Sequence, residues 1–582
     1  MSKVSCKKKV SRSSTSHGYI LTSYPSPRAL YRHIWSLTAK IPFTGTPQEV
    51  LKQRKKYHRF LSHLYISSRL QVIDKESFNK RQGFIPISSR FIEREFGRDF
   101  DVHLLRKWGL IKIKGHDTAR HKSREYRLKE KISRAAIKIE FENTLSVWKD
   151  LLKGRKVNLG LAVNLMTGRS ESSPVKSEYT KYEGGIRNTN LPKLIKNSMK
   201  SFEPCPFNPK YVIQYVGGLK NKYKRTKSKL KKIKALYGKD SQEYSLIDKE
   251  FLKARGRYQN DSLSMKTIIN QAPIKMKIKS KYGDPIYQYK AAYSVQVSGR
   301  LTEIHGGFQS ASKYFKRSFF RGILHLKMNY DLQSSQAYIL LQELEACNLK
   351  CNWLEMYLED PKSKKKFAKK VGVIGDVWKK CFYALIMGAN AKSRLGGIFG
   401  HFKDRYPGKY REAEKAHKRF MKITGELIVA TEKWRDYIYT THDRRYHYQH
   451  DGVKYWKNAC GMHFKNYGMI EDKDGKPVLI DRLHGDEEVR TKGGINKCKR
   501  KLAAFILQGQ EACFIHHLTI ICAENGIPVY KNEHDGLITG EKIPKKLVKK
   551  AAKLSGLNNP VLKRKSLCSK DKRKETRKFI ET

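Results

Sequence analysis

The sequence predicts a multidomain α+β protein, from its length, its apolar content and its mixture of helical and strand-like patterns. The chain has 582 residues, and domains of roughly 100–200 residues would divide it into three or four units. Hydrophobic residues form 39% of the chain and aromatic residues 11%, which is enough for buried cores and excludes a disordered basic polypeptide. The longest apolar runs, such as Leu518 to Ala523, are too short to cross a bilayer and exclude an integral membrane protein.

The charge of the chain indicates a polyanionic partner. Lys and Arg number 121 against 54 Asp and Glu, a net charge of +67, and the simplest partner for this excess is nucleic acid, bound through its phosphates. The ten cysteines include no CxxC pair, which excludes a zinc knuckle or a disulfide framework and favours a reducing, intracellular environment. We expect a cytoplasmic, nucleoid-associated monomer. The basic, Ser-rich N-terminus leaves organellar import open.

Residues 1–40 are expected to form a flexible basic arm, and residues 41–132 a compact domain. Apolar spacing predicts helices around 61–70, 91–96 and 102–108, followed by the short strands LIKIK and REYRL around a basic tip. This order resembles a winged helix-turn-helix, whose last helix enters the major groove and whose hairpin contacts phosphates. The alternative is a protein-docking module with a solvated basic face. The residues expected at DNA are Arg106, Lys107, Arg120, Lys122 and Arg124.

Residues 133–290 are expected to be a helical, strongly basic connector with two long helices that meet near Gly238. The lysine-rich run is either a solvated helical face or a pair of helices that grips a duplex. Glu140 and Glu142 are expected on a surface strand. The tail, residues 546–582, is also rich in Lys and is expected to be a solvated, phosphate-binding strip.

Two acidic residues in the C-terminal half stand next to predicted strands. Leu324 to Tyr330 alternates apolar and polar residues as a buried strand does, and Asp331 follows it; VYKNEHDGLITG (529–540) predicts a hairpin with Asp535 in its turn. Each is ordinary by itself, since Asp is common at helix N-caps and in turns. If the two carboxylates converge, however, they supply the hard oxygen ligands that Mg²⁺ requires.

The segment VWKKCFYALIMGANAKS (377–393) predicts a helix. Lys379, Tyr383 and Met387 are four residues apart and therefore share one face. That face would present a cation to a triphosphate and an aromatic ring to a base. The alternative is an ordinary amphipathic helix whose lysine reaches solvent.

Taken in order, segments between residues 290 and 545 resemble family A DNA polymerases. MNYDLQSSQAYIL resembles the first palm motif, WKKCFYALIMGANA the fingers motif Lys-x3-Phe-x3-Tyr-Gly, and NEHDGLIT the second palm motif, His-Asp-Glu. SGRLTEIHGGFQSAS, HFKDRYPGKY and KRKLAAFILQGQEACFIHH resemble further segments of that family in the same order. The resemblance implies a right-hand polymerase with helical thumb and fingers and an antiparallel-sheet palm, its core at 291–545.

The resemblance also assigns roles to individual residues. Asp331 and Asp535 would hold two Mg²⁺ ions, with the backbone carbonyl of Leu332 as a further ligand. Lys379 would meet the triphosphate of a dNTP, and Tyr383 would stack on its sugar and base, with Gln336 and Met387 close by. The residues expected at the DNA primer–template are Arg300, Arg500, Gln508 and His534.

The chain departs from the family at positions that bear on sugar discrimination, on base-pair fit and on the number of carboxylates. Gln336 replaces a Glu that crowds the sugar 2′ position, Met387 replaces a Tyr, and Gly536 replaces the acidic residue after His-Asp. No proofreading exonuclease motif precedes the polymerase-like region. The sequence therefore predicts a DNA polymerase without proofreading, acting in replication or repair. A single-subunit RNA polymerase or primase, or a DNA-binding replication protein with a degenerate core, stays open as an alternative.

Overall fold

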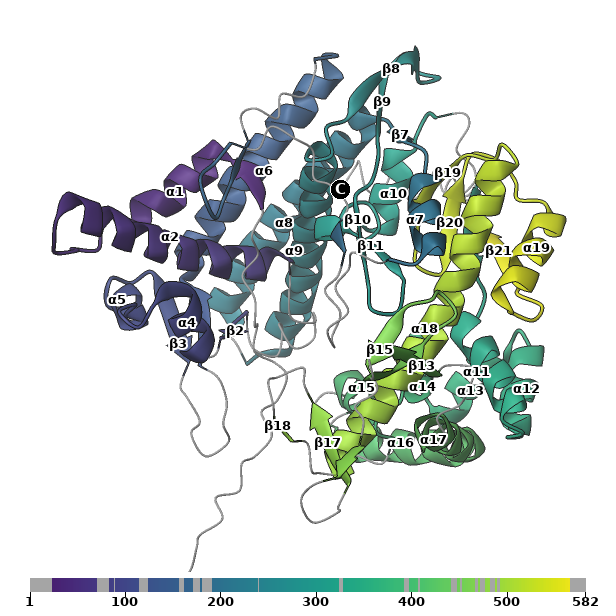
Figure 1. Ribbon diagram of the computed structural model, residues 1–582. Helices are drawn as coiled ribbons and strands as arrows, with labels where there is room; N and C mark the ends of the chain where they lie inside the picture. The colour runs from purple at the N-terminus through teal and green to yellow at the C-terminus, as the bar shows by residue number, and fades with distance from the viewer. Residues whose placement is uncertain are drawn as a thin grey trace, which may run out of the picture.

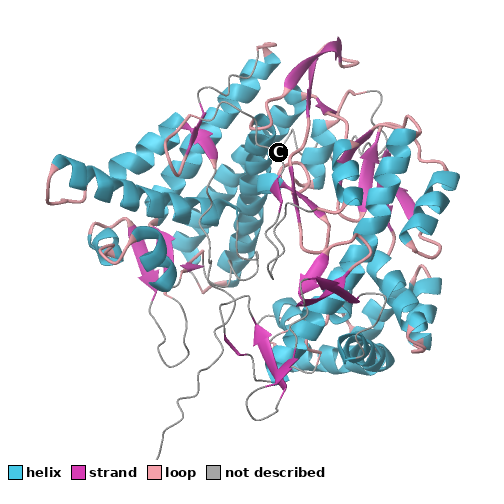
Figure 2. Cartoon of the chain, in the orientation of Figure 1, coloured by secondary structure: helices cyan, strands magenta, loops and turns pink. Residues whose placement is uncertain are grey.

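The protein consists of helices and small, mostly antiparallel sheets, with helices in the majority (Figures 1 and 2). The computed structural model describes residues 24–70, 83–87, 89–114, 124–155, 162–170, 178–179, 191–238, 240–323, 328–391, 397–406, 409–440, 447–450, 453–465, 469–471, 477–481, 487–488 and 492–565. Among the helices in these ranges, none combines the length and the apolarity needed to cross a bilayer.

The N-terminal unit combines helices with a three-stranded antiparallel sheet, in the strand order β2-β4-β3. Its elements are β1 (Pro25–Pro27), α1 (Arg28–Thr38), α2 (Pro47–Leu70), β2 (Ile85–Pro86), α4 (Ser89–Phe96), α5 (Val102–Lys107), β3 (Ile111–Lys114) and β4 (Glu125–Leu128). The predicted short helices and strands are thus confirmed, whereas the winged-helix assignment stays a prediction. Arg106, Lys107 and Arg124 are exposed, and Arg120 and Lys122 lie outside the described residues.

The expectation of a flexible arm over residues 1–40 is wrong for its second half. Residues 25–38 form β1 and α1, and β1 pairs with β5 (Ala162–Asn164). Leu30, Ile34 and Leu37 recur on one face of α1 and are buried. This apolar stripe is what gives α1 a core to pack on. Residues 1–23 lie outside the described ranges.

The connector contains α6 (Glu130–Leu152), α7 (Lys193–Lys200), α8 (Pro209–Tyr237) and α9 (Gln242–Ile269). Helices α8 and α9 are the predicted long pair, and Gly238, with φ +75°, ends α8 in a conformation that favours glycine. Tyr223 of α8 stacks on Tyr258 of α9 at a centroid distance of 5.6 Å. The short strands of this region are β5, β6 (Glu178–Tyr179), β7 (Cys205–Phe207), β8 (Ile274–Lys279) and β9 (Pro285–Tyr289).

Glu140 was expected on a surface strand, and this expectation is wrong. It lies in helix α6 and is fully buried, where it bonds Arg69 Nε of α2 and Lys266 Nζ of α9, each at 2.8 Å. Tyr24 donates its hydroxyl to the same carboxylate at 2.9 Å. We call these residues, Tyr24, Arg69, Glu140 and Lys266, the Glu140 cluster. It fastens the N-terminal unit to the connector helices.

The C-terminal half surrounds a four-stranded antiparallel sheet in the order β19-β20-β12-β21. The sheet strands are β12 (Met328–Leu332), β19 (Val529–Asn532), β20 (Gly536–Thr539) and β21 (Leu562–Lys565). The elements before β12 are β10 (Tyr293–Val295), β11 (Leu301–Glu303), the 3-10 turn η3 (Ile304–Gly306) and α10 (Lys313–Phe319). Asp331 lies inside β12 and not after it, and residues 324–327 of the predicted strand lie outside the described ranges.

Helices cover this sheet and form the rest of the C-terminal core. They are α11 (Ser335–Ala346), α12 (Asn352–Glu359), α13 (Ser363–Val371), α14 (Gly375–Ile386), α15 (Ile398–Arg405), α16 (Tyr410–Ile423), α17 (Gly425–Thr440), α18 (Lys492–Glu524) and α19 (Lys545–Ser555). Short strands between α17 and α18 are β13 (His447–His450), β14 (Val453–Lys457), β15 (His463–Lys465), β16 (Met469–Glu471), β17 (Pro477–Asp481) and β18 (Glu487–Glu488). Figure 1 shows α18 running the length of this half.

The C-terminal tail was expected to be a solvated strip from residue 546, and this expectation is also wrong for its first part. Helix α19 packs on α18 through the buried Leu547, Ala551 and Ala552. Strand β21 then joins the sheet beside β12. Apolar residues spaced along one face of a lysine-rich helix account for the packing.

Candidate active site

Strand pairing brings Asp331 and Asp535 together although they are far apart in the sequence. Strand β12 pairs antiparallel with β20, with Asp331 opposite Gly536. The backbone N–H of Leu332 donates to the carbonyl of Asp535 at 2.7 Å. Both acidic residues therefore stand at the same end of the same two neighbouring strands.

The backbone around the two acidic residues is tightly constrained. A Cβ atom at Gly536 would lie 1.9 Å from the carbonyl oxygen of Tyr330, so no side chain fits there. This explains in physical terms why the residue after His534-Asp535 is not acidic. Ser334, just after β12, and His534, at the hairpin tip, both adopt the left-handed region, with φ +50° and +68°. Such backbone strain is typical of functional turns.

A third carboxylate, Glu511 of α18, lies beside this pair. Its side chain is fully buried and binds the guanidinium of Arg300 and the hydroxyl of Ser335, the first residue of α11. Burial raises the pKa of Asp535 to about 6, and repulsion from Glu511 and Asp331 adds to the effect. Sequence reasoning missed Glu511. The available signal was a single acidic residue inside the apolar run ILQGQEACFI.

The C-terminal strand supplies a cation to Asp331. Lys565 of β21 forms an ion pair with Oδ2 of Asp331. Asp535, by contrast, has no ion-pair partner within the described part of the chain. The three carboxylates of this site thus outnumber their two cations: Arg300 pairs with Glu511, and Lys565 pairs with Asp331. Because like charges at short range disfavour ionisation, this excess is consistent with the raised pKa of Asp535. We call these five residues, Arg300, Asp331, Glu511, Asp535 and Lys565, the Asp331–Asp535 cluster.

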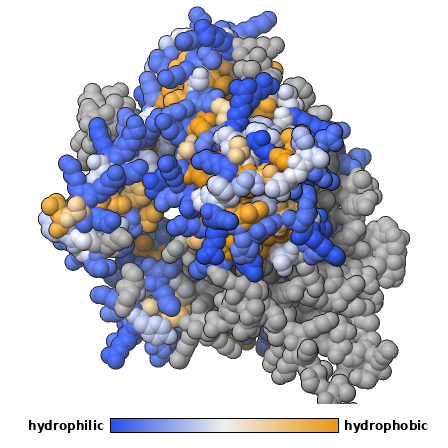
Figure 3. Space-filling model, turned by 90° about the vertical axis from the view of Figure 1, so that its left-hand side faces the viewer, coloured by the Kyte–Doolittle hydropathy of each residue, from blue (hydrophilic) through white to orange (hydrophobic). Residues whose placement is uncertain are grey.

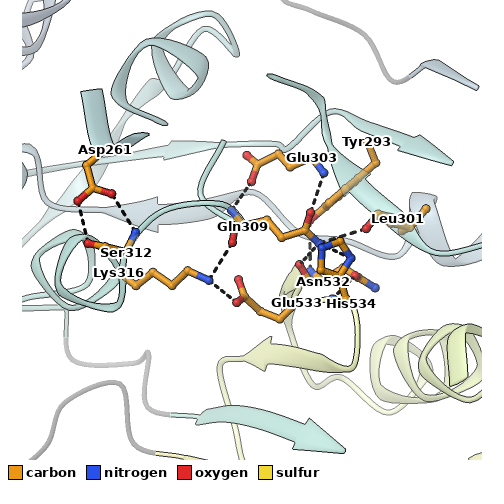
Figure 4. Close-up of polar contacts among 10 residues, drawn as sticks. All are labelled: Asp261, Tyr293, Leu301, Glu303, Gln309, Ser312, Lys316, Asn532, Glu533 and His534. Atoms are coloured by element: carbon orange, nitrogen blue, oxygen red, sulfur yellow. Dashed lines mark hydrogen bonds and ion pairs between the residues drawn. The ribbon is translucent and has the colours of Figure 1, made fainter. Parts of the chain in front are cut away.

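Gln309 anchors the hairpin that carries Asp535 (Figure 4). Its Nε2 donates to the carbonyls of Leu301 and Asn532, each at 3.1 Å, and lies 3.4 Å from Nδ1 of His534. Its backbone N–H and side-chain oxygen bond Glu303 at 2.9 Å each. A single amide therefore ties the hairpin tip to β11.

The same network holds Glu533 and His534 in place. Glu533 pairs with Lys316 of α10, which also donates to the carbonyl of Gln309 at 3.2 Å. Burial lowers the pKa of His534 to about 4, and repulsion from Arg300 and Lys316 contributes. His534 is therefore neutral at neutral pH and serves as a hydrogen-bonding group beside Asp535.

Helix α14 directs Tyr383 toward the same place. Burial raises the pKa of Tyr383 to about 12, while a hydrogen bond with the Ser334 side chain opposes the rise. Glu511 and Asp535 both act on its hydroxyl electrostatically, so the ring faces the cluster. Lys379, one turn earlier, is exposed and lies over the Tyr383 ring, with Nζ 5.6 Å from the centroid. Tyr383 is thus positioned beside the paired strands, and Lys379 lies next to its ring.

The remaining predicted residues lie on β12, α11, α18 and at the end of α14. Met387 caps the C-terminal end of α14 and Gln336 is half-buried in the first turn of α11. Gln508 is half-buried on α18, and Leu332 has a buried side chain. Arg500, also on α18, packs its stem against Gly388, just past the end of α14.

Arg300 is mostly buried and already paired, unlike a side chain that is free to contact DNA. Only 14% of its side chain is exposed, and its guanidinium is committed to Glu511. The sequence reasoning placed Arg300 at the primer–template without this partner. A role for Arg300 in holding Glu511 is therefore directly visible, whereas a contact with nucleic acid stays a prediction.

Asp331 and Asp535 supply the carboxylate oxygens of this centre. In the described ranges, no three His, Cys, Asp or Glu side chains gather as metal ligands. Asp331 and Asp535 would hold the ions, because carboxylate oxygens are the ligands that Mg²⁺ prefers, and Mg²⁺ sites of phosphoryl-transfer enzymes take their other ligands from water and substrate phosphates. The excess of negative charge in the cluster favours a cation at this position. The two carboxylates therefore suit such ions chemically, and metal binding by them stays a prediction.

Comparisons with known proteins find similarity among solved structures, and the one described below is remote. No protein-family model matches the chain, and no curated protein matches it. Among solved structures, the chain is similar to the POL domain of Pol1 from M. smegmatis in complex with DNA primer-template and dNTP. The TM-score is 0.41 at 10% sequence identity, over 64% of this chain and 69% of that one.

Proposed function

We propose that this protein is a template-directed nucleotidyltransferase, a family A-like DNA polymerase that extends a primer 3′-OH with dNTPs and lacks proofreading. The observation that carries the proposal is the pairing of β12 with β20, which sets Asp331 beside Asp535. The motif order described above supplies the reaction class. Replication or repair is the role that we assign to it.

Each residue of the site has a part in the proposed reaction. Asp331 and Asp535 hold two Mg²⁺ ions, which when bound lower the pKa of the 3′-hydroxyl and neutralise the developing phosphate charge. Lys379 binds the triphosphate, and Tyr383 positions the sugar and base of the incoming nucleotide. Glu511 and Arg300 fix the turn after Asp331 against α18. Gln309 and His534 hold the hairpin at the primer terminus.

The basic surface of the chain supports nucleic acid as the partner. On the face drawn in Figure 3, which is the left-hand side of Figure 1, the described residues are mostly hydrophilic with scattered hydrophobic patches. On the N-terminal unit, Arg106, Lys107 and Arg124 are exposed and are proposed to contact DNA phosphates. Replacing Arg106 and Lys107 by Ala should make the slope of log DNA affinity against log salt concentration shallower, by the equivalent of about two phosphate contacts. An unchanged slope would contradict a DNA contact by α5.

Primer extension tests the proposed function. We expect the full chain to add dNTPs to a primed DNA template in the presence of Mg²⁺, and Asp535→Asn to abolish the addition. Because Gln336 and Met387 bear on sugar selection, each reaction is repeated with rNTPs. A strong preference for rNTPs would replace the DNA polymerase by an RNA polymerase or primase. Absence of any addition, with DNA binding intact, would favour a degenerate core.

A further inference from the structure

Strand β21 carries a lysine to the carboxylate that the proposed function uses for metal binding. β21 pairs antiparallel with β12, with Lys563 opposite Asp331 and Lys565 opposite Asn329. The backbone N–H of Gln333 donates to the carbonyl of Val561 at 2.9 Å, which fixes the start of this pairing. Lys563 and Lys565 therefore project on the face of the sheet that carries Asp331. Lys565 is the one whose Nζ contacts Oδ2 of Asp331.

The two cations of the Asp331–Asp535 cluster differ in how readily each can separate from its carboxylate. Glu511 has no exposed side-chain surface and Arg300 only 14%, so their ion pair is enclosed. The side chains of Lys565 and Asp331 are 51% and 33% exposed. A lysine has a long, flexible stem and a well-hydrated ammonium group. Its head can therefore turn into water while the backbone of β21 stays paired.

We propose that Lys565 is a built-in competitor for the cation at Asp331, which holds that carboxylate until a divalent ion displaces it. This inference rests on the proposed function, because it assumes that Asp331 is a metal ligand. A carboxylate oxygen that contacts an ammonium group is not available to a metal at the same time. Removal of the Lys565 charge should therefore strengthen cation binding, whereas removal of Asp331 should weaken it.

Metal affinity measured without turnover tests the competition. Mn²⁺ is the probe, because carboxylate and water ligands suit Mn²⁺ as they suit Mg²⁺, and free Mn²⁺ is quantified by electron paramagnetic resonance. The full chain is titrated as wild type, Lys565→Gln and Lys563→Gln. Lys563 is the matched control, since it lies on the same strand and face and forms no ion pair within the described residues. It also carries the same charge.

We expect Lys565→Gln to bind Mn²⁺ roughly three- to tenfold more tightly than wild type at low ionic strength. Lys563→Gln should change the affinity by less than about twofold, since its charge is screened by water. Added salt should narrow the difference between wild type and Lys565→Gln. Equal or weaker Mn²⁺ binding by Lys565→Gln, or equal gains in the two variants, would overturn the proposal.

Asp331→Asn and Asp535→Asn separate this inference from the proposed function. If both weaken Mn²⁺ binding and Lys565→Gln does not strengthen it, the competition is refuted and the metal site stands. If neither Asn variant weakens Mn²⁺ binding, the carboxylates are not metal ligands and the proposed function fails with the inference.

Discussion

Two ionic clusters in the described part of the chain, the Glu140 cluster and the Asp331–Asp535 cluster, have opposite charge balance. In the Glu140 cluster one carboxylate is shared by two cations, Arg69 and Lys266, with all three side chains nearly inaccessible. In the Asp331–Asp535 cluster three carboxylates share two cations, and one ion pair is open to water. The first joins α2, α6 and α9, and the second lies where β12, β20, β21 and α18 meet.

The two clusters show that burial alone does not set the charge state of an acid. Burial raises the pKa of Glu140, but attraction to Lys266 and Arg69 outweighs it and the pKa falls to about 2. For Asp535 burial and the neighbouring acids act in the same direction, to about 6. A closed, cation-rich cluster is suited to fastening helices. An open cluster with unmatched negative charge is suited to binding an added cation.

The largest expected effect comes from Asp535→Asn. Nucleotide addition should fall by on the order of a thousandfold or more, as when a group that stabilises transition-state charge is removed. In chelator at pH 7 the free energy of unfolding should rise by up to about 3 kcal/mol, because a disfavoured buried charge is lost. Single-turnover incorporation and urea unfolding measure the two effects. Asp150→Asn is the control: its side chain is 41% exposed, and the loss of its ion pair with Arg155 at 3.2 Å should change neither quantity by much. A destabilised Asp535→Asn would contradict the unfavourable charge inferred for Asp535.

Glu140→Gln should show the reverse pattern. It leaves two cations buried without a counter-charge, which costs roughly 3–5 kcal/mol of unfolding free energy, and the folded fraction should keep its activity. Glu142→Gln is the control, since Glu142 is half-exposed and lies 3.9 Å from Lys138; its cost should be about 0.5 kcal/mol or less. Equal unfolding free energies in these two variants would contradict a structural role for the Glu140 cluster.

Glu140 should contribute to the pH dependence of stability at the acid end, beside buried histidines such as His534, whose pKa is also lowered. Since the folded-state pKa of Glu140 lies near 2 and its ordinary value is 4.5, its contribution is fully present above pH 4.5 and is lost as pH falls toward 2. This contribution amounts to about 3 kcal/mol. Urea unfolding of wild type and Glu140→Gln, from pH 6 to pH 3, should give converging free energies. Parallel curves would show that Glu140 does not titrate as proposed.

The smallest effect is expected within the Glu140 cluster itself. Burial lowers the pKa of Lys266 to about 8. Attraction to Glu140 opposes the fall but does not cancel it, because the same carboxylate also pairs with Arg69, which repels Lys266. Lys266→Met should therefore cost less than about 1.5 kcal/mol of unfolding free energy, with Arg69→Met costing more. Thermal and urea unfolding compare the two. A larger loss of unfolding free energy in Lys266→Met than in Arg69→Met would show that Glu140 contributes more to stability through Lys266 than through Arg69.

The sequence predicts local elements well where one periodicity dominates. Helices α8, α9 and α14 and the β19–β20 hairpin lie where apolar spacing and turn residues place them. The motif resemblance selected Asp331, Asp535 and Tyr383, which the fold brings to one place. These features depend on residues close together in the chain.

The features that sequence reasoning missed depend on distant partners. Glu140 is buried because Arg69 and Lys266 arrive from other helices, and no local pattern contains that information. Glu511 becomes part of the site through Arg300 and Ser335. Lys565 belongs to a lysine-rich tail whose apolar residues are few, so that charge alone predicted a solvated strip.

Anomalous scattering from Mn²⁺ in crystals of the full chain with primer–template and a non-hydrolysable dNTP tests the central claim most directly. The account predicts Mn²⁺ bound by the carboxylates of Asp331 and Asp535, with Lys565 turned away from Asp331 and Lys379 on the triphosphate. The account would be contradicted if the crystals held the nucleotide at another place and no Mn²⁺ at the carboxylates of Asp331 and Asp535.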